Sequence, residues 1–154
     1  MASWFKDLLP QLQQNWQQRE QRPLPDSIKF ALKYFEQIWV ADGSTLEALF
    51  RKLNSLEDVP RGQLAGKICT VINIVTRLPV ELWFCTNSRA SDTNFEADLL
   101  SLVSAKTLLL LDRGFYHFKF FAQLIDQQVD FITRLKAGAA VQVLQVFTNQ
   151  HHVL

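Results

Sequence analysis

A run of four leucines at residues 108–111, ending in Asp112, restricts the fold more than any other feature of the sequence. So short an uninterrupted apolar run is typical of a strand buried on both faces, in the middle of a parallel or mixed sheet. In open α/β sheets, ligands bind at the carboxyl ends of the strands. Asp112 is therefore expected where a sheet presents a functional group, and Gly114 is expected to let the chain turn away. The alternative is that Asp112 only caps the next helix, since aspartate is a common N-cap.

A second stretch has the same design. Residues 38–41 form a short apolar run that ends in Asp42, and Gly43 follows directly. Ser44 and Glu47 have the spacing of a capping box, which predicts a helix through residue 53. Carboxylates from separate strand ends can converge on a hard cation such as Mg²⁺, which prefers oxygen ligands. Two such ions can clamp the attacking and leaving oxygens of a phosphodiester, so Asp42 and Asp112 are candidate metal ligands.

The rest of the chain alternates between strand and helix patterns. Residues 3–22 read as an amphipathic helix that anchors on the core, and Pro10 predicts a kink or two shorter helices. Residues 67–76 and 80–86 predict an antiparallel hairpin. Asp92 is expected to cap a helix that continues to residue 103. A later helix over residues 116–127 is expected to bury Phe118, Phe121, Leu124 and Ile125, and strands are expected at 129–136 and 140–147.

Composition limits the class of protein. With 154 residues, 48% of them hydrophobic, the chain suffices for about one domain with a sizeable core. A net charge of +1 gives no indication of a polyanionic partner. Cys69 and Cys85 lie too far apart to suggest a zinc site or a disulfide scaffold. We expect a cytoplasmic protein without membrane spans, since no signal peptide and no apolar run of about 18 residues occurs.

Several motifs together resemble the catalytic domain of bacterial insertion-sequence transposases, in particular the insertion-sequence-four group. They are found at residues 40–45, 64–82, 91–92, 109–116 and 130–136. The resemblance implies an α/β fold: an RNase H-like mixed sheet flanked by helices, incomplete at the C-terminus. It implies two parts, an N-terminal helical segment (1–25) and the catalytic domain (26–154). Asp42 and Asp112 match the first two residues of the family's Asp-Asp-Glu triad. Mg²⁺ or Mn²⁺ is the implied cofactor, and transposon-end DNA the implied substrate.

The sequence departs from the family at the third carboxylate. The family carries it in a Tyr-x-x-Arg-x-x-x-Glu-x-x-x-x-x-x-Lys motif, whereas no glutamate follows Glu96 here. Asp126 and Asp130 are the acidic residues after Asp112, and neither is expected to replace it. We therefore expect a DNA transposase fragment that is inactive alone. The alternative is a catalytically dead product that binds DNA or full-length transposase and modulates transposition. A separate nuclease using Glu96 or Asp98 is a third hypothesis, which the sequence order disfavours.

Four basic residues are candidate DNA contacts, because phosphates are bound mainly by lysine and arginine. They are Lys67, Arg113, Arg134 and Lys136. The alternative is that they are solvated charges at strand edges. A sheet that lacks its covering helix is also expected to self-associate or to bind full-length transposase.

Overall fold

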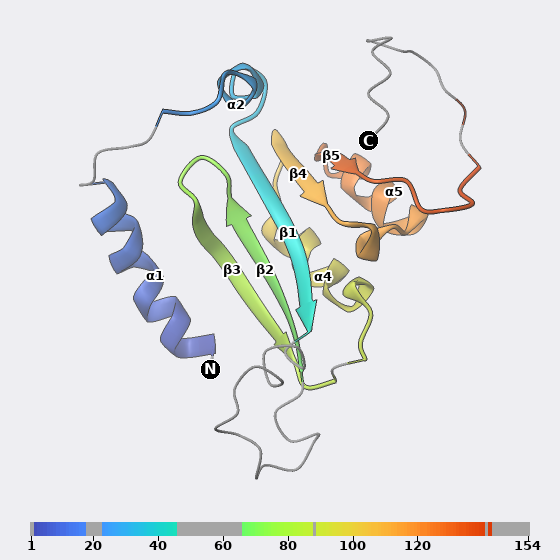
Figure 1. Ribbon diagram of the computed structural model, residues 1–154, viewed down its shortest axis with the longest axis horizontal. Helices are drawn as coiled ribbons and strands as arrows, with labels where there is room; N and C mark the ends of the chain where they lie inside the picture. Colours follow the sequence, from blue (N-terminus) through green and yellow to red (C-terminus); the bar gives the residue numbers. More distant parts are fainter. Residues whose placement is uncertain (1, 18–22, 46–65, 88, 141, 143–154) are drawn as a thin grey trace.

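The computed structural model describes residues 2–17, 23–45, 66–87, 89–140 and 142. Within them, five strands form one sheet in the order β3-β2-β1-β4-β5 (Figure 1). Strands β1, β2 and β3 are antiparallel neighbours, whereas β4 runs parallel to β1 and β5 parallel to β4. This is a mixed sheet, as the sequence predicted. The strands are β1 (Gln37–Thr45), β2 (Lys67–Asn73), β3 (Leu78–Cys85), β4 (Thr107–Leu111) and β5 (Asp130–Thr133).

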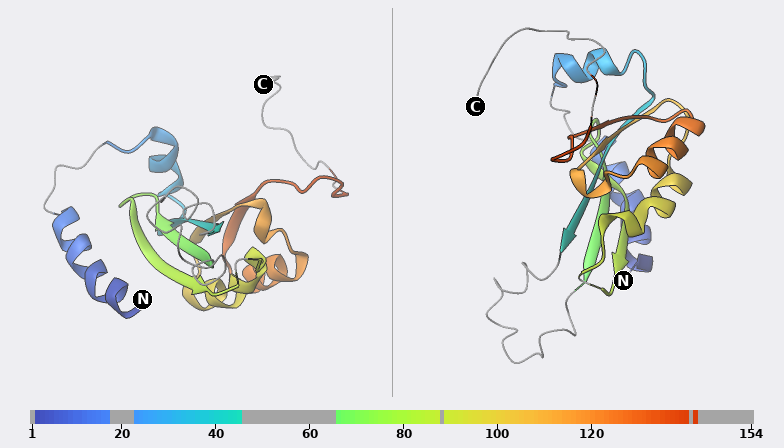
Figure 2. Two further views of the ribbon diagram at one scale, coloured as in Figure 1. Left: turned by 60° about the horizontal axis from the view of Figure 1, so that its bottom comes forward. Right: turned by 90° about the vertical axis from the view of Figure 1, so that its right-hand side faces the viewer.

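Two helices cover one face of the sheet (Figure 2). Helix α4 (Glu96–Leu102) follows the 3₁₀ turn η2 (Asp92–Phe95), and α5 (Phe118–Asp126) follows the 3₁₀ turn η3 (Arg113–Phe115). Both helices place apolar side chains against alternate residues of the strands, because successive strand residues point to opposite faces. The buried cluster between sheet and helices includes Trp39, Ala41, Cys69, Val71, Leu99, Leu109, Leu111, Phe115, Phe120 and Leu124.

The N-terminal helix packs on the sheet, as its apolar stripe predicted. Helix α1 (Ala2–Gln17) contacts β3, and its Trp16 lines one pocket together with Trp39 and Pro79. Pro10 lies inside α1 without ending it, so the expectation of two shorter helices is wrong. A short helix, α2 (Asp26–Ala31), leads into β1. The division of the chain at residues 25 and 26 stays a prediction.

Strand β1 is longer than the sequence predicted. It does not end at Asp42 but continues to Thr45, because these residues pair with β2, with Asp42 opposite Thr70. Only the pairing with β4 stops, at Ala41. Ser44 therefore lies in a strand. The helix predicted after it falls outside the described residues.

The C-terminal part differs from expectation in similar detail. Strand β5 ends at Thr133 rather than at residue 136. Ala140 is not in a strand, and most of the strand predicted at 140–147 falls outside the described residues.

No described helix is both long and apolar enough to cross a membrane. Cys69 is buried, Cys85 is half-buried, and both are free thiols.

The buried face of α5 also differs from the prediction. Phe120, Phe121 and Leu124 are buried, whereas Phe118 and Ile125 are exposed. Phe115 of η3 is fully buried, and its ring centroid lies 6.5 Å from that of Phe120, so Phe120 belongs to the face of α5 that meets the core.

We predict that Phe120→Ala lowers the free energy of unfolding by about 3–5 kcal/mol, because Phe120 has no exposed surface and its removal leaves a cavity. The matched control is Phe118→Ala in the same helix, where the side chain is 70% exposed. It is expected to change stability by less than about 0.5 kcal/mol. Urea denaturation measures both values, and equal losses would show that the register of α5 is wrong.

Candidate functional site

The pairing of β1 with β4 brings the two candidate aspartates together. Ala41 and Leu111 form the last pair of this parallel ladder, and Asp42 and Asp112 directly follow them in the chain. Ala41 and Leu111 point to the helices, so both aspartates project from the opposite face. The side chain of Asp112 is 45% exposed, and Asp42 is also exposed. Two carboxylates from neighbouring strands thus face solvent side by side.

A third charged residue, Arg134, lies next to these two aspartates, directly after the end of β5. Leu111 pairs with Thr133, so Arg134 lies beside Asp112, and its guanidinium donates a hydrogen bond to Asp112 Oδ1. This hydrogen bond lowers the pKa of Asp112 below its usual value. Asp112 stands at the N-cap position of η3, but its side chain makes no capping hydrogen bond there.

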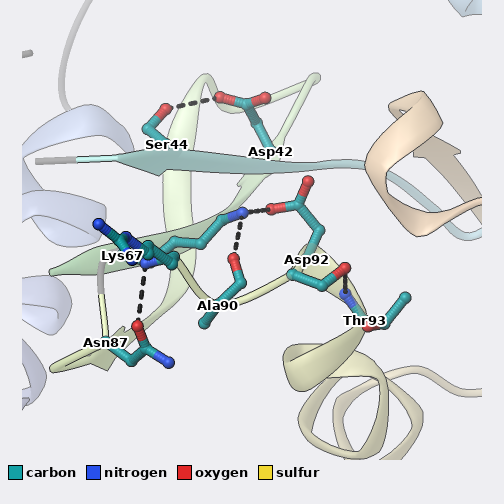
Figure 3. A network of polar contacts seen from close by, with 9 residues as sticks. Asp42, Ser44, Lys67, Asn87, Ala90, Asp92 and Thr93 are labelled. Carbon is teal, nitrogen blue, oxygen red and sulfur yellow. Dashed lines mark hydrogen bonds and ion pairs between the residues drawn. The ribbon is translucent and has the colours of Figure 1, made fainter.

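Asp42 has a different local partner. Its Oδ2 accepts a hydrogen bond from the Ser44 hydroxyl, at 3.0 Å. Both side chains project from the same side of β1 (Figure 3). This hydrogen bond is possible because β1 continues past Asp42, which places residues 42 and 44 on one face of the strand. Within the described part of the chain, the other oxygen of Asp42 makes no hydrogen bond to the protein.

A third carboxylate, that of Asp92, lies behind the strand. A Cβ atom built on Gly43 would lie 1.8 Å from Asp92 Oδ1, and one built on Gly114 would lie 1.7 Å from Asp92 Oδ2. Among the described glycines only Gly138 has a positive φ, so Gly43 and Gly114 are not needed for an unusual backbone conformation. They are needed for space. The prediction that Gly114 serves a turn missed this contact.

Lys67 holds the Asp92 carboxylate. Its Nζ lies 2.8 Å from Asp92 Oδ1 and donates a hydrogen bond to the carbonyl oxygen of Ala90 at 2.9 Å. The cap of the following 3₁₀ turn is Ser91, whose hydroxyl accepts from the N–H of Thr93, so the prediction that Asp92 caps it is wrong. The Lys67 side chain is only 11% exposed, which is less than a residue lining a DNA groove would need.

The donor chemistry of Asp42 and Asp112 fits a hard divalent cation. Carboxylate oxygens are the protein ligands that Mg²⁺ prefers, and one or two of them, with water and substrate oxygens, commonly suffice. In the described ranges, no group of three or more His, Cys, Asp or Glu side chains is arranged to hold a metal. The arrangement thus offers two ligands, with Asp92 on the other side of the strand (Figure 3).

The other acidic candidates lie elsewhere. Asp130 pairs with Leu108, at the end of β4 opposite to Asp112. Glu96 faces the imidazole of His117, with 3.0 Å between Oε2 and Nδ1. Three of the four candidate DNA contacts are exposed: Arg113, Arg134 and Lys136.

We predict that Arg134→Gln raises the pKa of Asp112 toward the usual value of an aspartate, because the hydrogen bond that favours the charged form is lost. In the wild type, the stability from this lowered pKa is present above the pKa of the unfolded chain. It is lost as pH falls through the folded value. Carbon-13 NMR titration of the carboxyl measures the shift. Lys119→Gln, an exposed change on α5, is the control, and an unaltered Asp112 pKa in Arg134→Gln would contradict the assignment.

We also predict that Gly114→Ala destabilises the fold by about 1–3 kcal/mol, the usual cost of an inserted methyl group, here forced onto Asp92 Oδ2. Gly138→Ala is not a suitable control, because Gly138 has a positive φ and Gly114 does not. The comparison is therefore with the double variant Gly114→Ala/Asp92→Ala. Removing the carboxylate is expected to recover part of the loss, which denaturant titration measures as a coupling energy. Strictly additive losses would mean that the two residues do not touch.

Comparison with known proteins identifies the family. A family model described as "Transposase DDE domain" matches residues 35–153. No curated protein is significantly similar to the chain. Among solved structures, the chain is similar to one in the simian T-cell lymphotropic virus intasome in complex with PP2A regulatory subunit B56 gamma, with 10% sequence identity and a TM-score of 0.44. That match covers 76% of this chain and 38% of the other, so this chain spans well under half of its length. The family match includes all five strands and both aspartates, and the chain therefore belongs to the transposase DDE domain family.

Proposed function

We propose that Asp42 and Asp112 are the first two carboxylates of a metal-dependent DNA transposase site of the insertion-sequence-four type. The observation that supports this most directly is the register of Ala41 with Leu111, which brings both aspartates to one exposed face. Two carboxylates at this point suit Mg²⁺ or Mn²⁺. When bound, such an ion stabilises the charge that develops on phosphodiester oxygens during cleavage and joining. The proposed substrate is transposon-end DNA.

The protein residues around the aspartates suit this role. Arg134 neutralises Asp112 from the side of β5. The Arg134 side chain is 70% exposed, so its guanidinium can also contact a DNA phosphate. Arg113 and Lys136 are exposed on the same C-terminal side of the sheet and are further candidate phosphate contacts. We do not include Lys67 among the proposed phosphate contacts, because its ammonium group pairs with Asp92.

We propose further that this chain alone neither cleaves nor joins DNA. The reaction needs a third carboxylate to complete the coordination of the ions. Asp130 begins β5 at the wrong end of the sheet, and Asp126 ends α5, just before it. Glu96 faces His117. None of these acidic side chains lies in the row formed by Asp42, Asp112 and Arg134.

A second candidate is a binding product that modulates transposition by joining a full-length transposase. It is favoured by the face of the sheet that points away from α4 and α5. There, in the described part of the chain, Ile72, Phe84 and Ile132 are exposed on three different strands. Contiguous apolar patches mark contacts with other proteins, and Ile72 and Ile132 lie in one row across the sheet with Val40 and Leu110 between them. This candidate predicts binding to transposase or to the DNA ends without turnover.

The test of the metal site is a Mn²⁺ titration followed by electron paramagnetic resonance. Asp42→Asn and Asp112→Asn are each expected to weaken Mn²⁺ binding about tenfold or more, which corresponds to roughly 1.4 kcal/mol. Asp130→Asn is the matched control, because it removes an exposed carboxylate at the other end of the sheet. Equal affinities in all four proteins would refute the site.

Activity is tested with the same proteins on the element's own end sequences. No nicking is expected with Mg²⁺ or Mn²⁺, and a gel-shift measurement shows whether DNA binds. Robust nicking that Asp42→Asn abolishes would refute the proposed inactivity. Binding of full-length transposase or of DNA without nicking would support the second candidate.

A further inference from the structure

Asp92 touches a glycine close behind each of the two aspartates: Gly43 directly follows Asp42, and Gly114 lies two residues after Asp112. One oxygen of its carboxylate lies against the Cα of Gly43, and the other lies against the Cα of Gly114. We propose that Asp92, held by Lys67, is a positioning residue that sets the distance and orientation between Asp42 and Asp112. This inference rests on the proposed function, in which the two aspartates hold a metal ion.

The main chain alone does not fix this distance. The ladder between β1 and β4 ends at Ala41 and Leu111. Beyond that pair β1 continues along β2, whereas the chain after β4 turns into η3. The two aspartates therefore lie just beyond the last hydrogen bonds that β1 and β4 share. The planar carboxylate of Asp92 lies across this gap and contacts both backbones from behind.

Lys67 fixes the carboxylate in turn. Its backbone is paired with Thr45 at the end of β1, and its ammonium lies 2.8 Å from Asp92 Oδ1. The same ammonium donates to the carbonyl of Ala90, in the loop that carries Asp92. The side chains of Lys67 and Asp92 are only 11% and 15% exposed. A continuous set of contacts thus runs from β1 through β2 and Asp92 to the turn after β4.

Asp92 is not placed as a metal ligand. Figure 3 shows Asp42 and Ser44 on one side of β1 and Asp92 with Lys67 on the other. The strand backbone separates the carboxylates. Groups that orient the ligands without touching the metal commonly change metal affinity 10- to 100-fold when they are removed.

The test compares Asp92→Ala with Asp92→Asn and with Asp98→Ala. Alanine removes the contact with both glycines, whereas asparagine keeps the planar head of the side chain and loses its charge. Asp98→Ala removes a carboxylate from the same helical region without a contact to either glycine. Asp92→Ala is expected to weaken Mn²⁺ binding about tenfold or more. Asp92→Asn is expected to lose about threefold or less, and Asp98→Ala to bind as the wild type does. Equal losses in Asp92→Ala and Asp92→Asn would overturn the inference in favour of a charge effect.

A metal-free measurement separates this inference from the proposed function. Native-state amide hydrogen exchange is expected to accelerate in Asp92→Ala at residues 42–44 and 112–114, and not in β3. Unchanged exchange at both segments overturns the inference, whatever the Mn²⁺ result.

If the wild type binds no Mn²⁺ through Asp42 and Asp112, the proposed function fails, and the exchange data alone decide whether Asp92 positions the two segments. If Asp92→Ala does not fold, Lys67→Met frees the carboxylate without shortening it and is expected to show the same two changes; wild-type exchange and affinity in that variant overturn the inference.

Discussion

The parallel pairing of β1 with β4 is the constraint on which the rest of the structure depends. It joins two stretches that lie about seventy positions apart in the sequence, and it aligns them at Ala41 and Leu111. A shift of one residue would send one aspartate to the helix side of the sheet, because side chains alternate along a strand. Burial of Trp39, Ala41, Leu109 and Leu111 against the helices opposes such a shift. The hydrophobic core therefore fixes the register that brings the carboxylates together.

The sheet also separates two kinds of polar group. Asp42, Asp112 and Arg134 lie on the solvent side, where charge is well hydrated and exchangeable. On the helix side, Asp92 and Lys67 are largely removed from water. The surroundings there are apolar enough that burial, with further contributions from carboxylates that include Asp92, raises the pKa of Cys69 to about 12. Its thiol therefore stays neutral at physiological pH and acts as part of the core.

The sequence was sufficient to predict the sheet, the hairpin and the two strands that carry the aspartates, because apolar runs and alternation are local signals. It misplaced the end of β1, since residues 42–45 are polar and stay in the strand only through their pairing with β2. It misplaced the buried face of α5, since the turn at η3 is set by packing of Phe115. Gly43 and Gly114 were visible in the sequence, but their shared neighbour, Asp92, is about fifty positions from one and about twenty from the other.

The energetics of the Lys67–Asp92 pair favour a geometric role over a stabilising one. Removing two charges from water costs about as much as their attraction returns, so partly buried ion pairs add little net stability. An apolar pair of similar volume would pack beneath the strands at no greater cost. An apolar side chain long enough to reach both glycines would lack the flat, two-pronged head that fits one oxygen against each of them. The carboxylate supplies that shape, and the lysine compensates its charge where water has little access.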